Sequence, residues 1–303
     1  MNDIRGDDDT PQSAAIDLCR LSDVRTLVTQ LGFHPSRALG QNFLTDRNIL
    51  DIFLDAADLN RQDRVLEVGP GLGVLTVEII ARAAHLTAVE KDHRLCRWLE
   101  QALPPSEKFR LIDGDVLDIG IPELLSDGVN KFISNLPYTP GSRILMDLIR
   151  DENAPRDIIV TVQLEVAQRI TAMPGSKTYG LMAVWSRLHY ESEIVKIISP
   201  NCFWPRPDVK SAIVRLRRRN TPVLASEHEE IFYALTRHVF QHRRKQLASI
   251  LAKAPQKLRI VPDVCRGILE NSGAPPSARP EELDLRQWCV LTELLAKRAA
   301  TTP

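Results

Sequence analysis

The stretch from Arg64 to Gly73, Arg-Val-Leu-Glu-Val-Gly-Pro-Gly-Leu-Gly, decides the fold of this chain. Its apolar residues between Val65 and Val68 form a short run that suits a buried strand, and three glycines follow at every second position. A helical pattern of apolar residues then begins at Val74. Strand, glycine turn and helix is how an open α/β sheet builds a small-molecule site at the carboxyl ends of its strands. Glycines let the backbone turn sharply there and lie against a ligand.

Two kinds of cofactor compete for such a turn. The dinucleotide fingerprint, G-x-G-x-x-G/A, needs a third small residue, and counted from Gly69 this position is Val74, which is too large. The spacing present is Glu67-x-Gly69-x-Gly71-x-Gly73, the pattern of S-adenosylmethionine-dependent methyltransferases. The spacing therefore favours S-adenosylmethionine, although an ordinary tight turn between a strand and a helix would also fit it.

Acidic residues follow the next two apolar segments. Residues 86–89 end at Glu90, and residues 109–112 lead to Asp115. A carboxylate at the end of the second strand can accept both ribose hydroxyls of an adenosine. A carboxylate after the third strand can accept the adenine amino group. Either acid alone would be read as a surface carboxylate, but acids at consecutive strand ends predict an adenosine-containing cofactor.

The fourth strand runs into the loop Asn135-Leu136-Pro137-Tyr138. Such a loop resembles the active loop of enzymes that methylate the exocyclic amine of adenine. The Asn135 side-chain oxygen and the Leu136 carbonyl can accept the two N–H bonds of N6, and Pro137 fixes the backbone that holds this carbonyl. Tyr138 offers a flat face on which an extruded base can stack. Positioning against the methyl sulfonium carries most of the rate, so neither a metal nor a strong base is needed.

With these motifs the chain resembles the ribosomal RNA adenine N6,N6-dimethyltransferases of the small-subunit (16S), kasugamycin-resistance type. The resemblance covers residues 33 to 298. It implies S-adenosyl-L-methionine as cofactor, S-adenosyl-L-homocysteine as product and no metal. It also implies dimethylation of two adjacent adenosines near the 3′ end of 16S rRNA during biogenesis of the 30S subunit. Further marks of the family are Arg37 to Leu44, Gln163 to Arg169, Pro174 to Gly180, Phe203 to Leu216, His238 to Leu247 and Ala278 to Leu283.

The resemblance also assigns residues to the site. Phe203 would lie across from Tyr138 and sandwich the flipped adenine, and Arg37 would meet RNA phosphate. One departure from the family is Thr139-Pro140-Gly141-Ser142, where Asn-Ile-Ser or a close variant usually follows the tyrosine. We expect this departure to affect how the target base is seated, not the cofactor site. The residues expected to hold the cofactor are Asn42, Leu44, Gly69, Gly71, Glu90, Asp115 and Asn135.

Charge is balanced over the whole chain, with 39 basic and 39 acidic residues, but it is not evenly spread. Residues 201–260 contain 13 Lys or Arg against 4 Asp or Glu. A solvated basic face would explain such a run, but beside a base-modifying site it favours contact with the RNA backbone and salt-dependent binding. The basic residues expected to bind RNA are Arg217 and Arg218 at the end of the last strand, and Arg243, Arg244 and Lys245 on one helix.

The expected fold class is α/β, a seven-stranded Rossmann-like class I methyltransferase sheet with a small all-helical C-terminal domain. We expect a disordered acidic tail over residues 1–14, the methyltransferase domain over 15–221 and a helical RNA-recognition domain over 222–303. Residues 17–30 should form a helix packed against the sheet. The five cysteines are scattered and odd in number, and no signal peptide or membrane span is present, which predicts reduced thiols in the cytoplasm. We also expect a monomer.

Two alternatives differ in target or in class. One is the related large-subunit rRNA methyltransferase that confers macrolide resistance, which shares the chemistry but modifies another RNA. The long helical C-terminal region with Ala278 to Leu283 favours the small-subunit type. The other is a non-catalytic assembly or transcription factor on the same fold, and the intact glycine turn and Asn-Leu-Pro-Tyr loop count against it.

Overall fold

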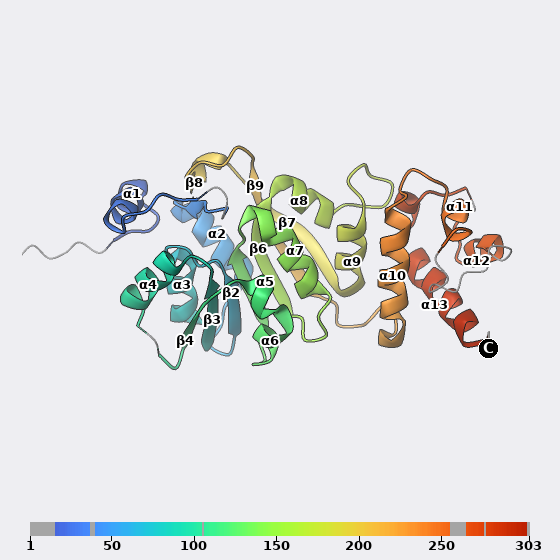
Figure 1. Cartoon of the computed structure of the whole chain (residues 1–303), viewed down its shortest axis with the longest axis horizontal. Helices are drawn as coiled ribbons and strands as arrows, with labels where there is room; N and C mark the ends of the chain where they lie inside the picture. The colour runs from blue at the N-terminus through green and yellow to red at the C-terminus, as the bar shows by residue number, and fades with distance from the viewer. Residues whose placement is uncertain (1–15, 37–39, 105, 255–264, 276, 302–303) are drawn as a thin grey trace, which may run out of the picture.

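A mixed seven-stranded sheet forms the centre of the protein, in the order β4-β3-β2-β5-β6-β9-β7. The computed structural model in Figure 1 describes residues 16–36, 40–104, 106–254, 265–275 and 277–301. The first five strands in this order, β4, β3, β2, β5 and β6, are parallel, and β9 runs antiparallel to both β6 and β7. The expected seven-stranded sheet is therefore confirmed. Its strands are β2 (Arg64–Val68), β3 (His85–Glu90), β4 (Phe109–Asp113), β5 (Lys131–Asn135), β6 (Asp157–Gln163), β7 (Tyr190–Ile198) and β9 (Ser211–Arg218).

Helices cover both faces of the sheet, which is why its central strands read as nearly continuous apolar runs. On one face Leu66, Phe132 and Ile158 pack against α7, and on the other Val65, Ile133 and Ile159 pack against α2 and α3. The helices around the sheet are α2 (Arg47–Ala57), α3 (Val74–Arg82), α4 (His93–Ala102), α5 (Val116–Ile119), α6 (Ile121–Leu125), α7 (Tyr138–Ile149), α8 (Leu164–Ile170) and α9 (Leu181–His189).

The two ends of β9 lie at opposite edges of the sheet. Ser211 pairs with Gln163, at the carboxyl end of β6, whereas Arg217 pairs with Asp157, at its amino end. At about 3.3 Å per residue, the arginines at the end of β9 lie about 20 Å from its first residue. The carboxyl ends of the parallel strands define one edge, which we call the carboxyl edge, and Arg217 lies at the other.

The N-terminal helix does not pack where the sequence pattern suggested. Helix α1 (Leu21–Gln30) buries Val24 and Leu27 against Leu72 in the glycine turn and Leu95 in α4, not against the sheet. The expectation of packing against the sheet is wrong because α2, α3 and α4 already cover that side. Figure 1 shows α1 beside α4 at the end of the molecule.

A second, two-stranded sheet joins segments far apart in the sequence. Strand β1 (Phe43–Leu44) pairs antiparallel with β8 (Phe203–Trp204), Phe43 opposite Trp204 and Leu44 opposite Phe203. A short 3₁₀ turn, η1 (Pro200–Cys202), precedes β8. The pairing holds two of the family-like segments beside each other at the carboxyl edge of the main sheet.

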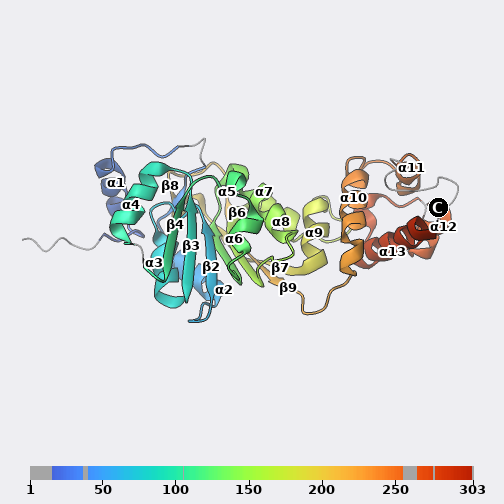
Figure 2. The same cartoon turned by 60° about the horizontal axis from the view of Figure 1, so that its bottom comes forward.

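The chain after β9 is helical, and Figure 2 shows these helices as one group beside α9. They share a core with the preceding region: Trp185 of α9 donates its indole N–H to Thr236 at 2.9 Å, and Tyr179 donates to the Leu283 carbonyl at 2.9 Å. The elements are η2 (Ser226–His228), α10 (Glu229–Phe240), α11 (Leu247–Leu251), α12 (Cys265–Asn271), η5 (Pro280–Glu282) and α13 (Leu285–Thr301). None of the described helices is both long and apolar enough to cross a membrane.

One expectation for this region is wrong. Residues 238–247 do not form one helix, because α10 ends at Phe240 and α11 begins at Leu247. The chain reverses between them so that Leu247 is buried and its N–H bonds to the Ala278 carbonyl at 2.8 Å. Arg243, Arg244 and Lys245 therefore lie in the turn over residues 241–246, which we call the basic turn. The predicted acidic tail, residues 1–14, lies outside the described residues.

Candidate active site

A cavity of about 270 Å³ opens at the carboxyl edge of the sheet. The glycine turn, the ends of β3, β4 and β5 and the segment 40–44 form its wall. Every residue expected to hold the cofactor lines this cavity. Of the residues expected to act on the base, all but Phe203 line it as well. The lining includes Asn42, Leu44, Gly69, Gly71, Glu90, Asp115, Asn135, Leu136, Pro137 and Tyr138.

The glycine turn needs its glycines for two separate reasons. Gly69, Gly71 and Gly73 have φ values of +71°, +61° and +95°, a region that disfavours other residues. A Cβ on Gly71 would also lie 3.1 Å from the Phe43 ring. The three glycines therefore allow this backbone conformation and add no side chain to the adjoining cavity.

Glu90 is held by backbone donors from three residues. Its carboxylate accepts from the N–H groups of Gly71 at 3.0 Å, Lys91 at 2.9 Å and Asp92 at 2.9 Å. Burial raises the pKa of Glu90, and the three hydrogen bonds oppose this by favouring the charged form. The result is a fixed acceptor at the end of β3, as an adenosine ribose requires.

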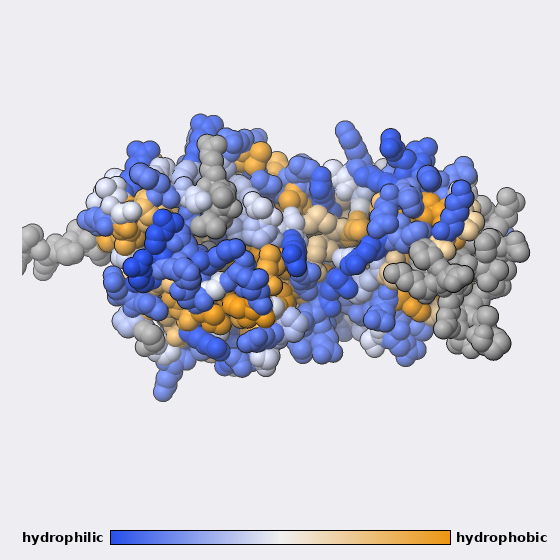
Figure 3. Space-filling model, in the orientation of Figure 1, coloured by the Kyte–Doolittle hydropathy of each residue, from blue (hydrophilic) through white to orange (hydrophobic). Residues whose placement is uncertain are grey.

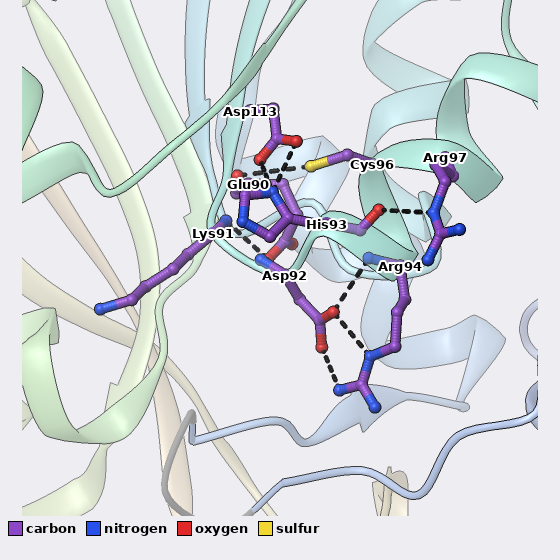
Figure 4. A network of polar contacts seen from close by, with 8 residues as sticks. All are labelled: Glu90, Lys91, Asp92, His93, Arg94, Cys96, Arg97 and Asp113. Carbon is purple, nitrogen blue, oxygen red and sulfur yellow. Dashed lines mark hydrogen bonds and ion pairs between the residues drawn. The ribbon is translucent and has the colours of Figure 1, made fainter.

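Asp92 ties the segment 40–44 to the sheet, a role that the sequence did not reveal. It accepts from Arg94, as Figure 4 shows, and from the Gln41 side chain at 2.9 Å. The bond from Arg94 is the main reason why the pKa of Asp92 is lowered to about 2. Gln41 in turn accepts from the N–H of Ser36 at 2.7 Å.

Asp115 lines the cavity with both carboxylate oxygens engaged. One accepts from the Leu117 N–H at 2.9 Å and caps α5, and the other lies 2.6 Å from the Lys91 ammonium. Chiefly through Lys91, the pKa of Asp115 is lowered. Asp115 is therefore an ionised acceptor in the cavity wall, and its contact with an adenine amino group stays a prediction.

Glu67 is a further acid of the cavity wall to which no role was assigned from the sequence. It is buried beneath the glycine turn and accepts from the Thr76 hydroxyl at 2.9 Å. Burial raises the pKa of Glu67 to about 8. The one signal in the sequence is its place two residues before Gly69.

Asn135 is oriented by the backbone of a distant segment. Its Nδ2 donates to the Asn42 carbonyl at 3.0 Å, and because a carbonyl can only accept, the amide must turn its oxygen away from Asn42. The Leu136 N–H donates to the Thr161 carbonyl at 3.2 Å, and Leu136 is only 2% exposed. The loop thus offers the cavity an amide oxygen on a fixed backbone.

The sequence pattern predicts a helix only from Arg143 to Leu148, but helix α7 begins at Tyr138 and so includes Thr139, Pro140 and Gly141. Pro140 lies in the first turn, where a backbone N–H has no partner within the helix, so its missing donor breaks no helical bond. Gly141 donates to the Pro137 carbonyl at 2.9 Å, and a Cβ there would lie 3.1 Å from Leu136. The unusual sequence is therefore compatible with a regular helix start.

Gly40 brings the segment 40–44 onto this loop. Its φ is +66°, and a Cβ on it would lie 2.9 Å from the Tyr138 nitrogen. The approach closes the cavity beside Asn135 and is the reason why Asn42 can reach that side chain. Gly40 belongs to the family-like stretch at 37–44, but nothing in that stretch indicated which residue it would touch.

The two aromatic residues differ in position. Tyr138 lines the cavity, and its hydroxyl lies 2.5 Å from Ser211 Oγ. Phe203 does not line the cavity: it is 4% exposed and packs in the core with Leu44 and Ile213, because β8 pairs with β1. The stacking role of Phe203 stays a prediction.

The residues expected to bind RNA fall into two groups. Arg217 and Arg218 lie at the edge opposite the cavity, where Arg217 pairs with Asp157 at 3.3 Å and Arg218 donates to the Ala154 carbonyl at 2.6 Å. In the basic turn, Arg243 pairs with Glu281 at 2.5 Å. Arg244 and Lys245 are exposed, and no carboxylate of the described residues pairs with them. Arg37 lies outside the described residues.

Two further expectations concern metals and thiols. Within the described ranges, no three His, Cys, Asp or Glu side chains converge where a metal ion could be held. Among the described residues, Cys19, Cys96, Cys202 and Cys289 are free thiols.

Comparison with known proteins assigns most of the chain to one sequence family. The model of the family described as ribosomal RNA adenine dimethylase matches residues 32–271. Ribosomal RNA small subunit methyltransferase A of Clostridium perfringens is 32% identical over 93% of this chain and 99% of that protein. The protein of the same name from Streptococcus pneumoniae is 34% identical over 90% of this chain and 96% of its own length.

Two solved structures share the fold. A dimethyladenosine transferase from Plasmodium falciparum superimposes with a TM-score of 0.74 at 23% identity, covering 84% of this chain and 98% of that one. The 23S rRNA methyltransferase ErmE superimposes with a TM-score of 0.62 at 27% identity, covering 84% of this chain and 100% of that one. The class I methyltransferase architecture expected from the glycine turn is thus confirmed.

Proposed function

The chain belongs to the ribosomal RNA adenine dimethylase family, and from this premise we propose that it dimethylates N6 of two adjacent adenosines near the 3′ end of 16S rRNA. The methyl donor in this proposal is S-adenosylmethionine, and the substrate is the immature 30S subunit during its biogenesis. The full-length similarity to proteins named ribosomal RNA small subunit methyltransferase A supports this target. We propose that the enzyme acts as a monomer in the cytoplasm.

The observation that carries the proposal is the orientation of the Asn135 amide beside the glycine turn. The bond to the Asn42 carbonyl leaves Asn135 Oδ1 free to accept from N6, and the Leu136 carbonyl is the second acceptor. Two acceptors favour a pyramidal nitrogen whose lone pair is available for attack. S-adenosylmethionine would supply the methyl group and leave as S-adenosylhomocysteine, and Asn135 and the Leu136 carbonyl would hold N6 as it exchanges one proton, lost to solvent, for each methyl group. A second donor molecule would supply the second methyl group.

The cofactor residues fit the proposed donor. When bound, S-adenosylmethionine supplies an electrophilic methyl group on a sulfonium. Glu90, fixed by three backbone N–H groups, is suited to accept from ribose hydroxyls, and Asp115 to accept from the adenine amine. Gly69 and Gly71 allow close approach of the backbone. Asn42 and Leu44 would close the cavity from the opposite wall.

For RNA contact we propose the basic turn in preference to the end of β9. The turn lies on the same side of the molecule as the carboxyl edge in Figure 1, and Figure 3 shows mostly hydrophilic side chains above α10. Arg244 and Lys245 are exposed and can approach phosphates. Arg217 and Arg218 have partners and lie at the other edge. We keep residues 222–303 as the proposed RNA-recognition domain and 15–221 as the methyltransferase domain.

The experiment is methyl transfer from labelled cofactor to unmethylated 30S and 50S subunits, with the product mapped by mass spectrometry. Wild type should place four methyl groups on two neighbouring adenosines near the 3′ end of 16S rRNA. Removing one positioned polar group commonly costs about 100-fold in rate, and we expect this loss or more for Asn135→Ala. Asn153→Ala, which removes an exposed amide whose side chain has no bond among the described residues, is the matched control.

The other outcomes identify the alternatives. Methyl groups on 23S rRNA alone would favour the large-subunit function instead. Equal product from wild type and Asn135→Ala would refute the assigned role of the loop. Absence of any transfer, together with retained binding to subunits, would favour a non-catalytic assembly factor.

A further inference from the structure

The Tyr138 hydroxyl has a partner that is itself immobile. It lies 2.5 Å from Oγ of Ser211, a fully buried residue and the first of β9. Ser211 pairs with Gln163 of β6 on one side and with Ile198 of β7 on the other. Because both neighbouring strands fix its backbone, Ser211 Oγ is a rigid point of attachment.

The Tyr138 ring is consequently fixed at both ends. Tyr138 is the first residue of α7 and follows Pro137, whose φ of −63° is fixed by the proline ring. Its phenol oxygen is held by Ser211, so the hydroxyl is engaged within the protein. What remains for a ligand in the cavity is the face of the ring, as stacking with a base requires.

From this geometry we infer that Ser211 is a positioning residue for methyl transfer: it sets the angle of the Tyr138 ring against which the target adenine stacks. The inference rests on the proposed function. Ser211 does not line the cavity and acts through Tyr138. It also assigns a purpose to the Ser211 position within the family-like stretch from Phe203 to Leu216.

The effect should fall on turnover and not on RNA affinity. A ring without its anchor lets the flipped base leave the line between N6 and the methyl donor, and small losses of alignment cost rate. Affinity for a ribosomal subunit comes mainly from phosphate contacts spread over the protein surface. A purely structural role for Ser211 would instead lower stability and every activity together.

The test compares Ser211→Ala, Tyr138→Phe and the double variant in single-turnover and steady-state methylation of unmethylated 30S subunits. Each single variant removes the same hydrogen bond, so each should lower kcat by about tenfold and leave KM for the subunit within about twofold. The double variant should be no slower than the slower single variant. Ser186→Ala is the matched control, because Ser186 is buried in α9 and its Oγ has no partner among the described atoms. It should retain wild-type kcat.

Thermal unfolding and calorimetric binding of S-adenosylhomocysteine show whether the variants are folded. Full kcat in either single variant, or independent losses that multiply in the double variant, would overturn the inference. If Ser211→Ala does not fold, Tyr138→Phe still decides, because it leaves Ser211 in place. Absence of transfer by wild type would overturn the proposed function and the inference with it, whereas transfer by wild type with unaffected variants overturns the inference alone.

Discussion

The two halves of the cavity are built in different ways. The cofactor half consists of Gly69, Gly71, Glu90 and Asp115, and its bonds join neighbouring strand ends, such as Gly71 to Glu90. The base half consists of the loop Asn135 to Tyr138, and its bonds come from distant segments: the Asn42 carbonyl holds Asn135, and Ser211 holds Tyr138. Successive βα units therefore form the first half, and tertiary packing forms the second.

This difference has a functional consequence that can be tested. Changes in the cofactor half should act on affinity for the cofactor, because its groups are acceptors and backbone already in place. Changes in the base half should act on turnover, since its groups align a base that arrives with the RNA. Each variant below is paired with a control that keeps the same chemistry but lies outside the half concerned.

The largest effect on affinity for the cofactor is expected in the cofactor half. Glu90→Gln replaces an acceptor-only group by an amide whose NH₂ would face backbone donors that now point at the carboxylate. With hydrogen bonds to a charged group worth about 1.5–3 kcal/mol, affinity for S-adenosylhomocysteine should fall about 100-fold. Isothermal titration calorimetry measures this, and kcat at saturating cofactor should stay within about threefold of wild type.

Asp113→Asn is the control for that variant. Asp113 is an exposed acid at the end of the next strand, it pairs with His93, and it does not line the cavity. Its replacement should leave affinity unchanged. A Glu90→Gln protein that binds S-adenosylhomocysteine normally but turns over slowly would remove the distinction between the halves.

The same division explains how much the sequence could predict. The strands, the glycine turn and the acids at Glu90 and Asp115 were found from the sequence, because period, spacing and strand order are local properties of a βα sheet. All cofactor residues named from these patterns and from the family resemblance line the cavity. That they bind the cofactor stays a proposal.

What the sequence could not supply was the partner of each segment. The pattern of α1 identified an apolar face but not that the glycine turn and α4 would cover it. The basic turn was assigned to a helix through the family-like stretch His238 to Leu247, and its all-polar sequence gave no sign that α10 ends at Phe240 and that a new helix begins at Leu247. Gly40, Asn42 and Ser211 each contact the Asn135–Tyr138 loop across long stretches of chain, and no local rule indicates such contacts.

A smaller effect is expected in the base half. Gly40→Ala and Gly32→Ala impose the same backbone strain, because both glycines have φ near +66°, and each should lose about 1–2 kcal/mol of unfolding free energy. Only the Cβ at position 40 meets the Tyr138 nitrogen, at 2.9 Å, whereas nothing lies within 4 Å of one at position 32. Gly40→Ala should therefore lower kcat by about tenfold, and Gly32→Ala should retain it.

Calorimetry and methylation kinetics on 30S subunits separate the two contributions. Affinity for S-adenosylhomocysteine should change less than kcat in Gly40→Ala, because Glu90 and Asp115 are untouched and only the segment with Asn42 and Leu44 is displaced. Equal losses of kcat at the two positions would mean that strain alone matters, and that the close approach of Gly40 to the loop does not.

The smallest effect concerns the affinity of the basic turn for RNA. Arg244→Ala and Lys245→Ala each remove an exposed charge from the basic turn and should weaken binding to 30S subunits about fivefold at physiological salt. Each should also reduce the slope of log affinity against log salt by about one, measured by filter binding over a range of salt. Arg217→Ala removes an arginine that is paired with Asp157 at the opposite edge, so it should change neither quantity.

None of the three variants should alter affinity for S-adenosylhomocysteine, because none of the three side chains lines the cavity. A reduced salt slope for Arg217→Ala, with normal slopes for the turn variants, would move the RNA path to the far edge of the sheet, about 20 Å from the first residue of β9. Such a result would leave the cavity without a nearby RNA anchor and would require the base half to be reassigned.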